Sequence, residues 1–423
     1  MKRIFAAALV LVLALGLGVP AFAAGGYAIT NPYEDVDWNV GPFKANLHAH
    51  TTFSDGGMDL ADVVEEYYAQ GYDTLALTDH GVVEASWDQR PLLTPPLDIQ
   101  NWFGGLRKVL SSARLAQITA GEGEGRGGRG MIQVPKGIEM NAAVVYKNHV
   151  VGLYAGWGYY WTGLDNDFRT PIRMTEKRGG ITFIAHPGEW VGGNEEGAGD
   201  PAYANFFADI LRDYGTCLGI EVYNRVDTVT RWSRLLWDNL LKRLMPEGRQ
   251  VFGFANDDSH KRSDIGGTAE LLYMPSNTAD NVRKCLEKGA FLACSKRDRI
   301  VLGDQYAAPS DKPFPSLKKV TVTGNTIAIE TDDTDEIIWI ADGEKVGEGP
   351  NVDLTNAKIT SYVRAQLTGE GGISLTQAFG VDKGYTYPDD ALKGAEKIMW
   401  TIKLYLAKNP IAWLIENIGK LFK

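Results

Sequence analysis

Cysteine is scarce in this chain of 423 residues, which contains only Cys217, Cys285 and Cys294. Three cysteines can form at most one disulfide bond within the chain, so a small fold held together by several disulfides is excluded. No two of them have the spacing of a zinc ribbon. We predict that Cys285 and Cys294 form a pair, and that Cys217, which lies in an apolar stretch, is a buried thiol.

Basic residues are in the minority. Lys and Arg number 43 against 53 Asp and Glu, which gives a formal net charge of −10. An acidic surface repels the phosphates of DNA and RNA, so this balance argues against broad nucleic-acid binding. The share of apolar residues, 44%, is that of an ordinary globular protein, which excludes a disordered or fibrous chain.

A long hydrophobic run occurs at the start of the chain. Lys2 and Arg3 precede the apolar residues 4–19, and the small-residue stretch 21–24 follows. This arrangement is typical of a secretory signal peptide, and it predicts cleavage after Ala23 and a secreted or periplasmic protein. The apolar run is shorter than the roughly 20 residues that a membrane span needs. An uncleaved membrane anchor is the alternative.

Short apolar runs alternate with helical segments between residue 43 and about residue 300. Such alternation is typical of parallel βα units, and seven runs in one stretch favour a closed or nearly closed barrel over an open sheet. The runs expected to be strands are Phe43–Leu47, Thr74–Thr78, Gln133–Glu139, His149–Tyr154, Ile181–Ala185, Cys217–Val222 and Val251–Ala255. The segments expected to be helices are Leu60–Gln70, Pro201–Tyr214 and Thr228–Leu244.

Helical periodicity disappears after about residue 315. Residues 316–385 read as a small β-sandwich-like module with a hairpin turn at Asp342-Gly343. Its expected strands are Val320–Ile329, Glu336–Ile340, Ile359–Gln366 and Gly372–Phe379. Residues 391–423 return to a helical pattern. We therefore predict an N-terminal extension (24–42), an α/β barrel (43–310), this β-rich module and a helical tail, in that order.

The six histidines stand at the ends or at the first residues of the expected strands. In a parallel βα barrel the carboxyl ends of the strands meet on one face, where such folds build their sites. His48 and His50 are two residues apart in an extended run, so their imidazoles point to the same side of the chain. Two neutral imidazoles can share a metal ion, and Asp55 on the following turn can add an oxygen ligand.

Similar residues follow at four later strand ends. They are Asp79 with His80, Glu139 followed by His149, His186 before a proline, and Asp258 with His260. A carboxylate such as Glu139 can bridge two metal ions, and a carboxylate beside a histidine can orient it. A lone histidine such as His186 is more often a satisfied core residue. The coincidence at five strand ends nevertheless favours a metal centre.

In their order along the chain, these motifs resemble the PHP family, which is named for polymerase and histidinol phosphatase domains. They read His-x-His-x4-Asp-Gly, Asp-His, Gly-x-Glu, His, His-Pro and Asp-x-His, and the resemblance covers roughly residues 43–300. It implies a distorted (β/α)7 barrel with two or three divalent ions. The Asn-Pro-Tyr segment at residues 31–33 and the β-rich module resemble a secreted branch of that family.

The resemblance also implies a ligand set in which all six histidines take part. The first ion would be held by His48, His50, Glu139 and Asp258, the second by Asp55, His80 and His260, and the third by Glu139 as a bridge with His149 and His186. Some relatives carry a histidine where this chain has Asp55. The harder oxygen ligand can shift the preference toward manganese or iron, so zinc is not assured.

These residues predict an exported metal-dependent phosphoesterase that hydrolyses a small phosphorylated substrate with a metal-activated water. Arg225, Lys261 and Arg262 are the cations that can hold a phosphate. We interpret Asp79 and Asp257 as groups that orient the ligand histidines. The alternatives are a metallohydrolase of amide, carbamate or carboxyl-ester bonds, and a binding protein that uses the β-rich module.

The helical tail has a separate feature. Apolar residues fall on one face of residues 411–422, and Ile398, Met399, Ile402 and Leu406 form a second stripe. Residues 396–423 contain five lysines and two glutamates on an otherwise acidic chain. Such a basic amphipathic end can lie on an anionic membrane surface. The alternative is that the stripes pack against the rest of the protein or a second subunit.

Overall fold

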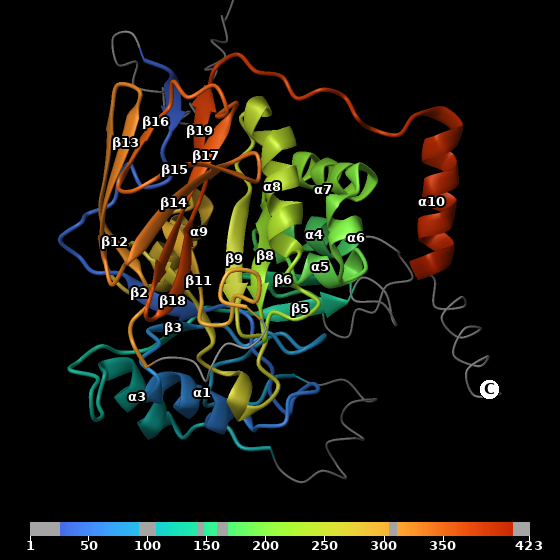
Figure 1. The fold of residues 1–423 in the computed structure, drawn as a ribbon. Helices are drawn as coiled ribbons and strands as arrows, with labels where there is room; N and C mark the ends of the chain where they lie inside the picture. Colours follow the sequence, from blue (N-terminus) through green and yellow to red (C-terminus); the bar gives the residue numbers. More distant parts are fainter. Residues whose placement is uncertain (1–25, 93–106, 142–147, 159–167, 304–310, 409–423) are drawn as a thin grey trace, which may run out of the picture.

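The computed structural model describes residues 26–92, 107–141, 148–158, 168–303 and 311–408. The predicted signal peptide and the tail from residue 409 lie outside these ranges. Within them the chain forms a mixed α/β structure of three β-sheets with helices around them (Figure 1). The helices are α1 (Leu60–Ala69), α3 (Ser112–Ala120), α4 (Arg169–Glu176), α5 (Pro187–Trp190), α6 (Glu195–Gly199), α7 (Pro201–Asp213), α8 (Ser233–Leu244), α9 (Ala279–Lys288) and α10 (Gly394–Lys408), with the 3₁₀ helices η1 (Met245–Glu247) and η2 (Arg262–Asp264).

A five-stranded sheet positions three of the six histidines: His149, His186 and His260. Its strands lie side by side in chain order: β5 (Ile138–Asn141), β6 (His149–Leu153), β7 (Ile181–Ile184), β8 (Cys217–Asn224) and β9 (Phe252–Asn256). The pairs β7–β8 and β8–β9 are parallel, whereas β5–β6 and β6–β7 are antiparallel. The seven residues between β5 and β6 are too few for the crossover that a parallel pair requires.

The largest sheet has eleven strands and runs across both halves of the chain. Its path is β1 (Ala28–Thr30), β19 (Phe379–Asp382), β17 (Tyr362–Gly369), β18 (Gly372–Thr376), β11 (Phe291–Ser295), β10 (Thr268–Leu272), β2 (Phe43–Asn46), β3 (Thr74–Leu75) and β4 (Ile132–Gln133), with β14 (Glu336–Ala341) beside β17 and β15 (Glu344–Glu348) beside β14. Because β18 pairs with β11, the sheet continues from the predicted barrel region into the predicted β-rich module.

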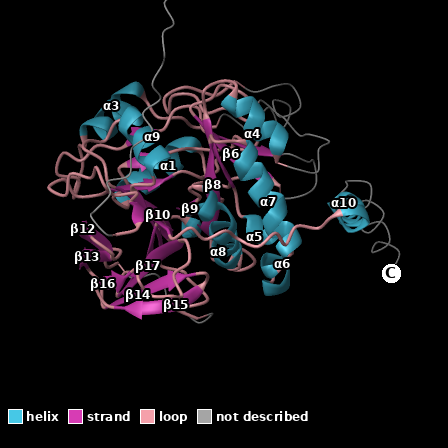
Figure 2. Cartoon of the chain, turned by 90° about the horizontal axis from the view of Figure 1, so that it is seen from above, coloured by secondary structure: helices cyan, strands magenta, loops and turns pink. Residues whose placement is uncertain are grey.

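The third sheet contains β12 (Ser316–Thr323), β13 (Thr326–Asp332) and β16 (Asn351–Asp353). The single strand expected over Val320–Ile329 is wrong, because Gly324, at φ +57°, turns the chain into a hairpin there. Figure 2 shows these strands on the opposite side of the molecule from helices α4 to α7.

The predicted (β/α)7 barrel is not confirmed, because no closed sheet is formed by the residues that the structure describes. The two larger sheets instead meet through two isolated bridges, Ala49 with Ser259 and His80 with Glu139. The run Gln133–Glu139 is also not one strand. Pro135, which has no N–H to donate, separates β4 from β5.

An apolar cluster lies below the strand ends and fixes their positions. It contains Leu47, next to β2, together with Phe183 of β7 and Phe254 of β9. The rings of Phe183 and Phe254 are stacked, with centroids 4.3 Å apart. The cluster therefore joins residues of both larger sheets beneath the polar side chains that follow them.

The predicted helices are present, with one shifted start. Helix α1 begins at Leu60 as expected, and Gly71, at φ +79°, follows its C-terminal cap. Helix α8 begins at Ser233 rather than at Thr228, because the preceding residues form turns. Among the described residues, no helix is long and apolar enough to cross a membrane.

The predicted disulfide is wrong. All three cysteines are buried and free. The thiol of Cys285 on α9 lies 3.1 Å from the carbonyl oxygen of Ala290, whereas Cys294 Sγ on β11 accepts a hydrogen bond from Ser374 Oγ. The two sulfur atoms therefore face different partners, and all three cysteines behave as Cys217 was expected to.

Helix α10 has two apolar faces. On one, Leu404 is buried and Trp400 packs against Tyr203 of α7, with ring centroids 5.5 Å apart. The other is open to solvent: its large side chains are between 46% and 61% exposed, and they are Ile398, Met399, Ile402 and Leu406. Part of the tail thus packs against the protein, as one alternative expects, while the second predicted stripe is left exposed.

Candidate metal centre

The ends of β2, β3 and β9 are tied together by backbone hydrogen bonds, and this brings the first histidines together. The N–H of Asp258 donates to His48 O at 2.9 Å, and the N–H of His50 donates to Ser259 O at 3.0 Å. On the other side of β2, the N–H of Thr78 donates to Ala49 O at 2.8 Å. The chain that carries His48 and His50 is therefore held between the segments that carry Asp258 and His80.

The carboxylate of Glu139 is the centre of the site. It is 1% exposed and lies within ion-pair distance of five histidines. Its Oε2 atom is 3.2 Å from His48 Nε2, 3.1 Å from His50 Nε2 and 3.2 Å from His80 Nδ1. Its Oε1 atom is 2.8 Å from His149 Nδ1 and 3.2 Å from His186 Nε2. The two oxygens thus face two different sets of imidazoles, which is what a bridging ligand requires.

A buried group of donors surrounds Glu139 Oε2. Its members are His48, His50, Glu139 and Asp258, the same four residues that the resemblance implies for a first ion. Asp258 Oδ1 lies 3.1 Å from His50 Nε2, and the Nε2 atoms of His48 and His50 are 3.2 Å apart. Asp258 takes a left-handed backbone conformation, φ +43°, which is strained for a residue other than glycine and is typical of functional positions.

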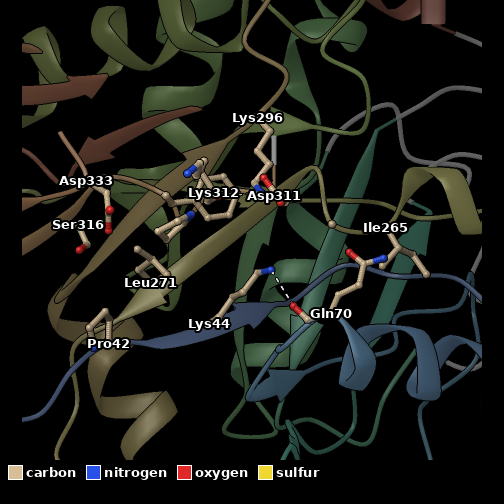
Figure 3. A pocket seen from close by; sticks show the side chains of 13 residues that line it. Pro42, Lys44, Gln70, Ile265, Leu271, Lys296, Asp311, Lys312, Ser316 and Asp333 are labelled. Atoms are coloured by element: carbon tan, nitrogen blue, oxygen red, sulfur yellow. Dashed lines mark hydrogen bonds between the residues drawn. The ribbon is translucent and has the colours of Figure 1, made fainter. Parts of the chain in front are cut away.

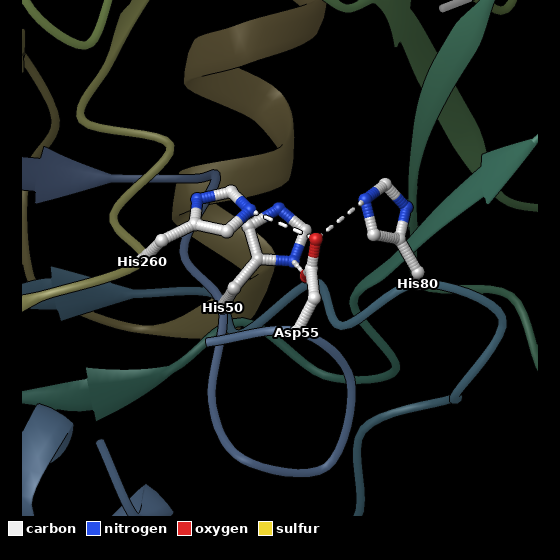
Figure 4. A group of neighbouring side chains, drawn as sticks. All are labelled: His50, Asp55, His80 and His260. Carbon is white, nitrogen blue, oxygen red and sulfur yellow. Dashed lines mark hydrogen bonds and ion pairs between the residues drawn. The ribbon is translucent and has the colours of Figure 1, made fainter. Parts of the chain in front are cut away.

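A second and more open group contains His50, Asp55, His80 and His260 (Figure 4). Asp55 Oδ2 lies 3.3 Å from His260 Nε2 and 3.8 Å from His80 Nε2, and Asp55 Oδ1 lies 3.5 Å from His50 Nδ1. The Asp55 side chain is 56% exposed. His50 joins the three residues expected for a second ion and offers its other ring nitrogen to the first group.

The third group differs from the expectation in one member. It contains His80, Glu139 and His149, whereas His186 was expected with Glu139 and His149. His186 is nevertheless close, because its Nε2 atom lies 3.2 Å from His149 Nδ1 as well as from Glu139 Oε1. The structure therefore brings all nine predicted ligands into one cluster.

The charged groups of the cluster shift one another's pKa values. Burial lowers the pKa of His50, but Asp258 and Glu139 outweigh burial and raise it to about 10. Burial raises the pKa of Glu139 and of Asp258, but the neighbouring histidines hold both far below their usual range. Burial lowers the pKa of His80 to about 4. In the metal-free protein at neutral pH, Glu139 and Asp258 are therefore anionic, His80 is neutral and His50 is protonated. A metal ion bound by His50 would displace its proton, so metal binding is expected to weaken as the pH falls.

The donor set fits divalent metal ions. Nitrogen and carboxylate oxygen atoms converge in groups of three or four, each within 4.8 Å of the others in its group. Imidazole with carboxylate suits zinc, iron and manganese, and sulfur ligands, which select softer metals, are absent from these groups. Any two of the three groups share one residue, so ions in them would be neighbours.

Sequence reasoning missed Glu221, the residue that orients His48. Glu221 Oε1 accepts hydrogen bonds from His48 Nδ1 at 2.8 Å and from Asn256 Nδ2 at 3.0 Å. Glu221 Oε2 accepts from the N–H of His186 at 2.9 Å and from Asn224 Nδ2 at 2.9 Å. This carboxylate therefore leaves Nε2 of His48 as the free ligand atom. The signal in the sequence was a single charged residue inside the apolar run Cys217–Val222, and in the structure all eight residues of that strand are buried.

Among the described residues, Asp79 and Asp257 make no direct hydrogen bond to a ligand histidine, and their orienting role stays a prediction. Asp79 accepts hydrogen bonds from the N–H and Oγ1 of Thr51 and from Ser54 Oγ. Asp257 accepts from the N–H groups of residues 266–268, from Thr268 Oγ1 and from Tyr72. Asp79 is linked to an imidazole through Ser54, whose Oγ also lies 3.3 Å from His50 Nδ1. Asp257, next to the ligand Asp258, holds the turn before β10.

The three predicted phosphate-binding cations differ in their surroundings. The N–H of Arg225 donates to Asn256 O at 3.2 Å, two residues before Asp258, and its side chain is 42% exposed. Arg262 is 67% exposed and is paired with Glu66 of α1. Lys261 is exposed at the start of η2. The backbone of Arg225 is thus held beside the strand end that leads to Asp258, and its guanidinium lies 3.9 Å from Asp264 Oδ2.

We predict that Glu221→Gln weakens metal binding by about 10- to 100-fold, the usual effect of losing a partner of a ligand histidine. Glutamine has an NH₂ group in place of one carboxylate oxygen, so donors that now meet an acceptor at residue 221 would meet another donor. Titration of the metal-free protein with zinc or manganese against an indicator dye measures the change.

Glu270→Gln is the matched control for Glu221→Gln. Burial raises the pKa of Glu270 well above its usual range, so glutamine resembles its neutral form. Equal effects of the two substitutions would contradict the role of Glu221.

Fold and cluster together define a class: a mixed α/β protein with a buried histidine and carboxylate cluster suited to several divalent ions. No protein-family model and no curated protein matches the chain. One similar solved structure is a two-domain protein of Bacteroides vulgatus that is described as containing a PHP-like metal-dependent phosphoesterase. It has 15% sequence identity and a TM-score of 0.40, and the match covers 81% of this chain and 96% of that one.

Two other solved structures are also similar. One is from Bifidobacterium adolescentis and is described as a metal-dependent phosphoesterase; it has 15% identity and a TM-score of 0.31 over 59% of this chain and 98% of that one. The other is a lesion-specific endonuclease of Pyrococcus furiosus with 13% sequence identity and a TM-score of 0.35. The match covers 61% of this chain and 60% of that one. PHP-like phosphoesterases, the family that the motifs resemble, are thus among the structural neighbours.

Proposed function

We propose that this chain is a metal-dependent phosphoesterase that hydrolyses the phosphate ester of a small molecule. The observation that carries the proposal is the buried Glu139 carboxylate, which faces five histidines with its two oxygens. Asp55 and Asp258 complete the donor groups on either side. A site with a bridging carboxylate and overlapping donor groups suits two or three divalent ions.

Divalent ions held by these groups would activate a water and neutralise charge on the oxygens of the transferring phosphoryl group. The chain's own residues hold the donors and receive the substrate. Glu221 orients His48, and Asp79 and Asp257 hold the loops of the site. Arg225, anchored to Asn256, is the cation that we expect to contact the phosphate, and a guanidinium can do so with two hydrogen bonds. Asp55 favours manganese or iron in the open group, with zinc as the alternative.

A hydrolysis screen tests the proposal. Protein loaded with manganese, iron or zinc would be offered an aryl phosphomonoester, an aryl phosphodiester, an aryl carboxyl ester and an anilide. We expect turnover of a phosphate ester that disappears in the Asp258→Asn variant. Cleavage of the carboxyl ester or anilide alone would instead support a metallohydrolase of other bonds, and no turnover of any substrate would favour a binding protein.

We also propose that the protein is exported and that the exposed face of α10 contacts an anionic membrane surface. The apolar face lies opposite the side that is fixed by Trp400 and Leu404, so it points away from the body of the protein. Lys397 and Lys403 on the same helix are exposed. Basic residues beside an outward apolar face are typical of helices that lie on anionic lipid.

Vesicle sedimentation tests this contact. The full chain is expected to sediment with vesicles containing phosphatidylglycerol and not with pure phosphatidylcholine. Ile402→Glu, which puts a charge into the apolar face, should leave most of the protein in the supernatant. Thr401→Glu adds the same charge beside that face and should sediment nearly as the parent does. Equal sedimentation of the Ile402→Glu variant and the parent would refute the membrane contact.

A further inference from the structure

A pocket lined by lysines lies outside the metal centre, between β2, β10 and the start of β12 (Figure 3). Its volume is about 510 Å³, within the range of about 300–1,000 Å³ that is usual for small-molecule sites. Lys44 of β2, Lys296 after β11 and Lys312 before β12 all line it, although they come from distant parts of the sequence. None of its lining residues belongs to the metal cluster.

Lys44 is the most unusual of these lysines. Its side chain lies in the wall of the pocket, where Nζ donates a hydrogen bond to Gln70 O at 3.2 Å and sits 3.9 Å from the centroid of the Tyr72 ring. Among the described residues, no carboxylate forms an ion pair with it. Burying an ammonium group without a paired anion is costly. Burial accordingly lowers the pKa of Lys44 to about 8.

Lys296 faces the same space. Its Nζ donates to Lys312 O at 3.0 Å and lies 5.2 Å from the centroid of the Phe314 ring, and Lys44 Nζ lies 5.9 Å from the same centroid. The charge of Lys296 lowers the pKa of Lys44 further, whereas the carboxylates of Asp257 and Asp73 raise it without offsetting the effect of burial. Asp311 and Asp333 also line the pocket, so three lysines face two aspartates. The lining is therefore net positive in a chain whose net charge is −10.

The geometry points to an anion site: we propose that the pocket binds the phosphate, or another oxyanion, of a small molecule between Lys44 and Lys296. An oxyanion there would accept hydrogen bonds from both ammonium groups and remove their mutual repulsion. Phe314, Leu271 and Ile265 provide an apolar wall for the remainder of such a ligand. The site goes beyond the proposed hydrolysis, because it uses no residue of the metal centre.

Competitive acetylation of lysines tests the site in the full-length protein. The protein would be treated with an N-hydroxysuccinimide ester of acetate near pH 8, with and without inorganic phosphate, against sodium chloride of equal ionic strength. Peptide mass spectrometry gives the rate at each lysine. With phosphate at about ten times its Kd, we expect the rates at Lys44 and Lys296 to fall about tenfold. The rates at the exposed Lys318 and Lys345 should stay constant.

Two variants locate the effect. Asp258→Asn alters the metal centre and should leave the protection of Lys44 intact, whereas Lys296→Met removes one ammonium group and should reduce it. Unchanged acetylation rates in phosphate would overturn the proposal. Protection that disappears in Asp258→Asn, or that persists fully in Lys296→Met, would also overturn it, because phosphate would then act at the metal centre or without Lys296. Because the measurement does not depend on turnover, its outcome is separate from that of the hydrolysis screen.

Discussion

Replacing Glu139 with glutamine is expected to reduce phosphate-ester hydrolysis by at least about 100-fold while the chain remains folded. Loss of a partner of a ligand already costs about 10- to 100-fold, and Glu139 is itself a candidate ligand to more than one ion. The amide keeps the size of the side chain but removes the negative charge that faces five imidazoles. Rates with an aryl phosphate, measured beside circular dichroism spectra, test this expectation.

Glu84→Gln is the matched control for this experiment. Glu84 is also a buried glutamate, but its oxygens accept hydrogen bonds from the N–H of Leu77 and from Trp87 Nε1, and no histidine contacts it among the described residues. Its replacement should cost far less activity. A Glu139→Gln variant that hydrolyses at the parent rate would show that the cluster is not the reacting site.

Removal of metal is expected to abolish hydrolysis completely. We expect the purified protein to carry two or three transition-metal ions per chain, because three overlapping donor groups are available. Dialysis against a chelator should remove both metal and activity, and adding back manganese, iron or zinc should restore them, with the most effective ion identifying the preferred metal. Elemental analysis before and after dialysis gives the stoichiometry.

The controls for metal removal separate loss of the ions from loss of the fold. Circular dichroism of the dialysed protein should show helix and strand content close to that of the parent, because the apolar cluster of Leu47, Phe183 and Phe254 lies outside the donor groups. Protein grown with all three metals that retains full activity at trace metal content would contradict the metal-dependent reaction.

The gathering of the nine candidate ligands could be predicted from the sequence, because each lies at an end of a short apolar run or in the turn that follows it. His48 and His50, two residues apart in an extended segment, must point to the same side. The same periodicity could not predict Glu221, whose role depends on the packing of β8 against the segment that carries His48. The hydrogen-bond partners of Asp79 and Asp257 could not be predicted either, because these residues neighbour ligands in sequence but accept from loop N–H groups in the folded protein.

The sheet arrangement was less predictable than the site. The expected list of strands omits β10 and β11, although these two strands connect β2 with β18. Pairing between strands that are distant in sequence depends on which edges meet in the folded protein, and composition does not encode it. The Cys285–Cys294 pair was wrong for a similar reason, because nearness in sequence did not put the two sulfur atoms face to face.

The pairing of β18 with β11 has a consequence for how the chain resists self-association. Strand β11 is buried along its whole length and is bonded on one side to β10 and on the other to β18. Without β18, its residues Leu292, Ala293 and Cys294 would form an unpaired sheet edge, which is a template for aggregation. Strand β18 therefore protects the edge of the sheet that contains β2 from pairing with other molecules. A chain that ends before β18 is expected to precipitate.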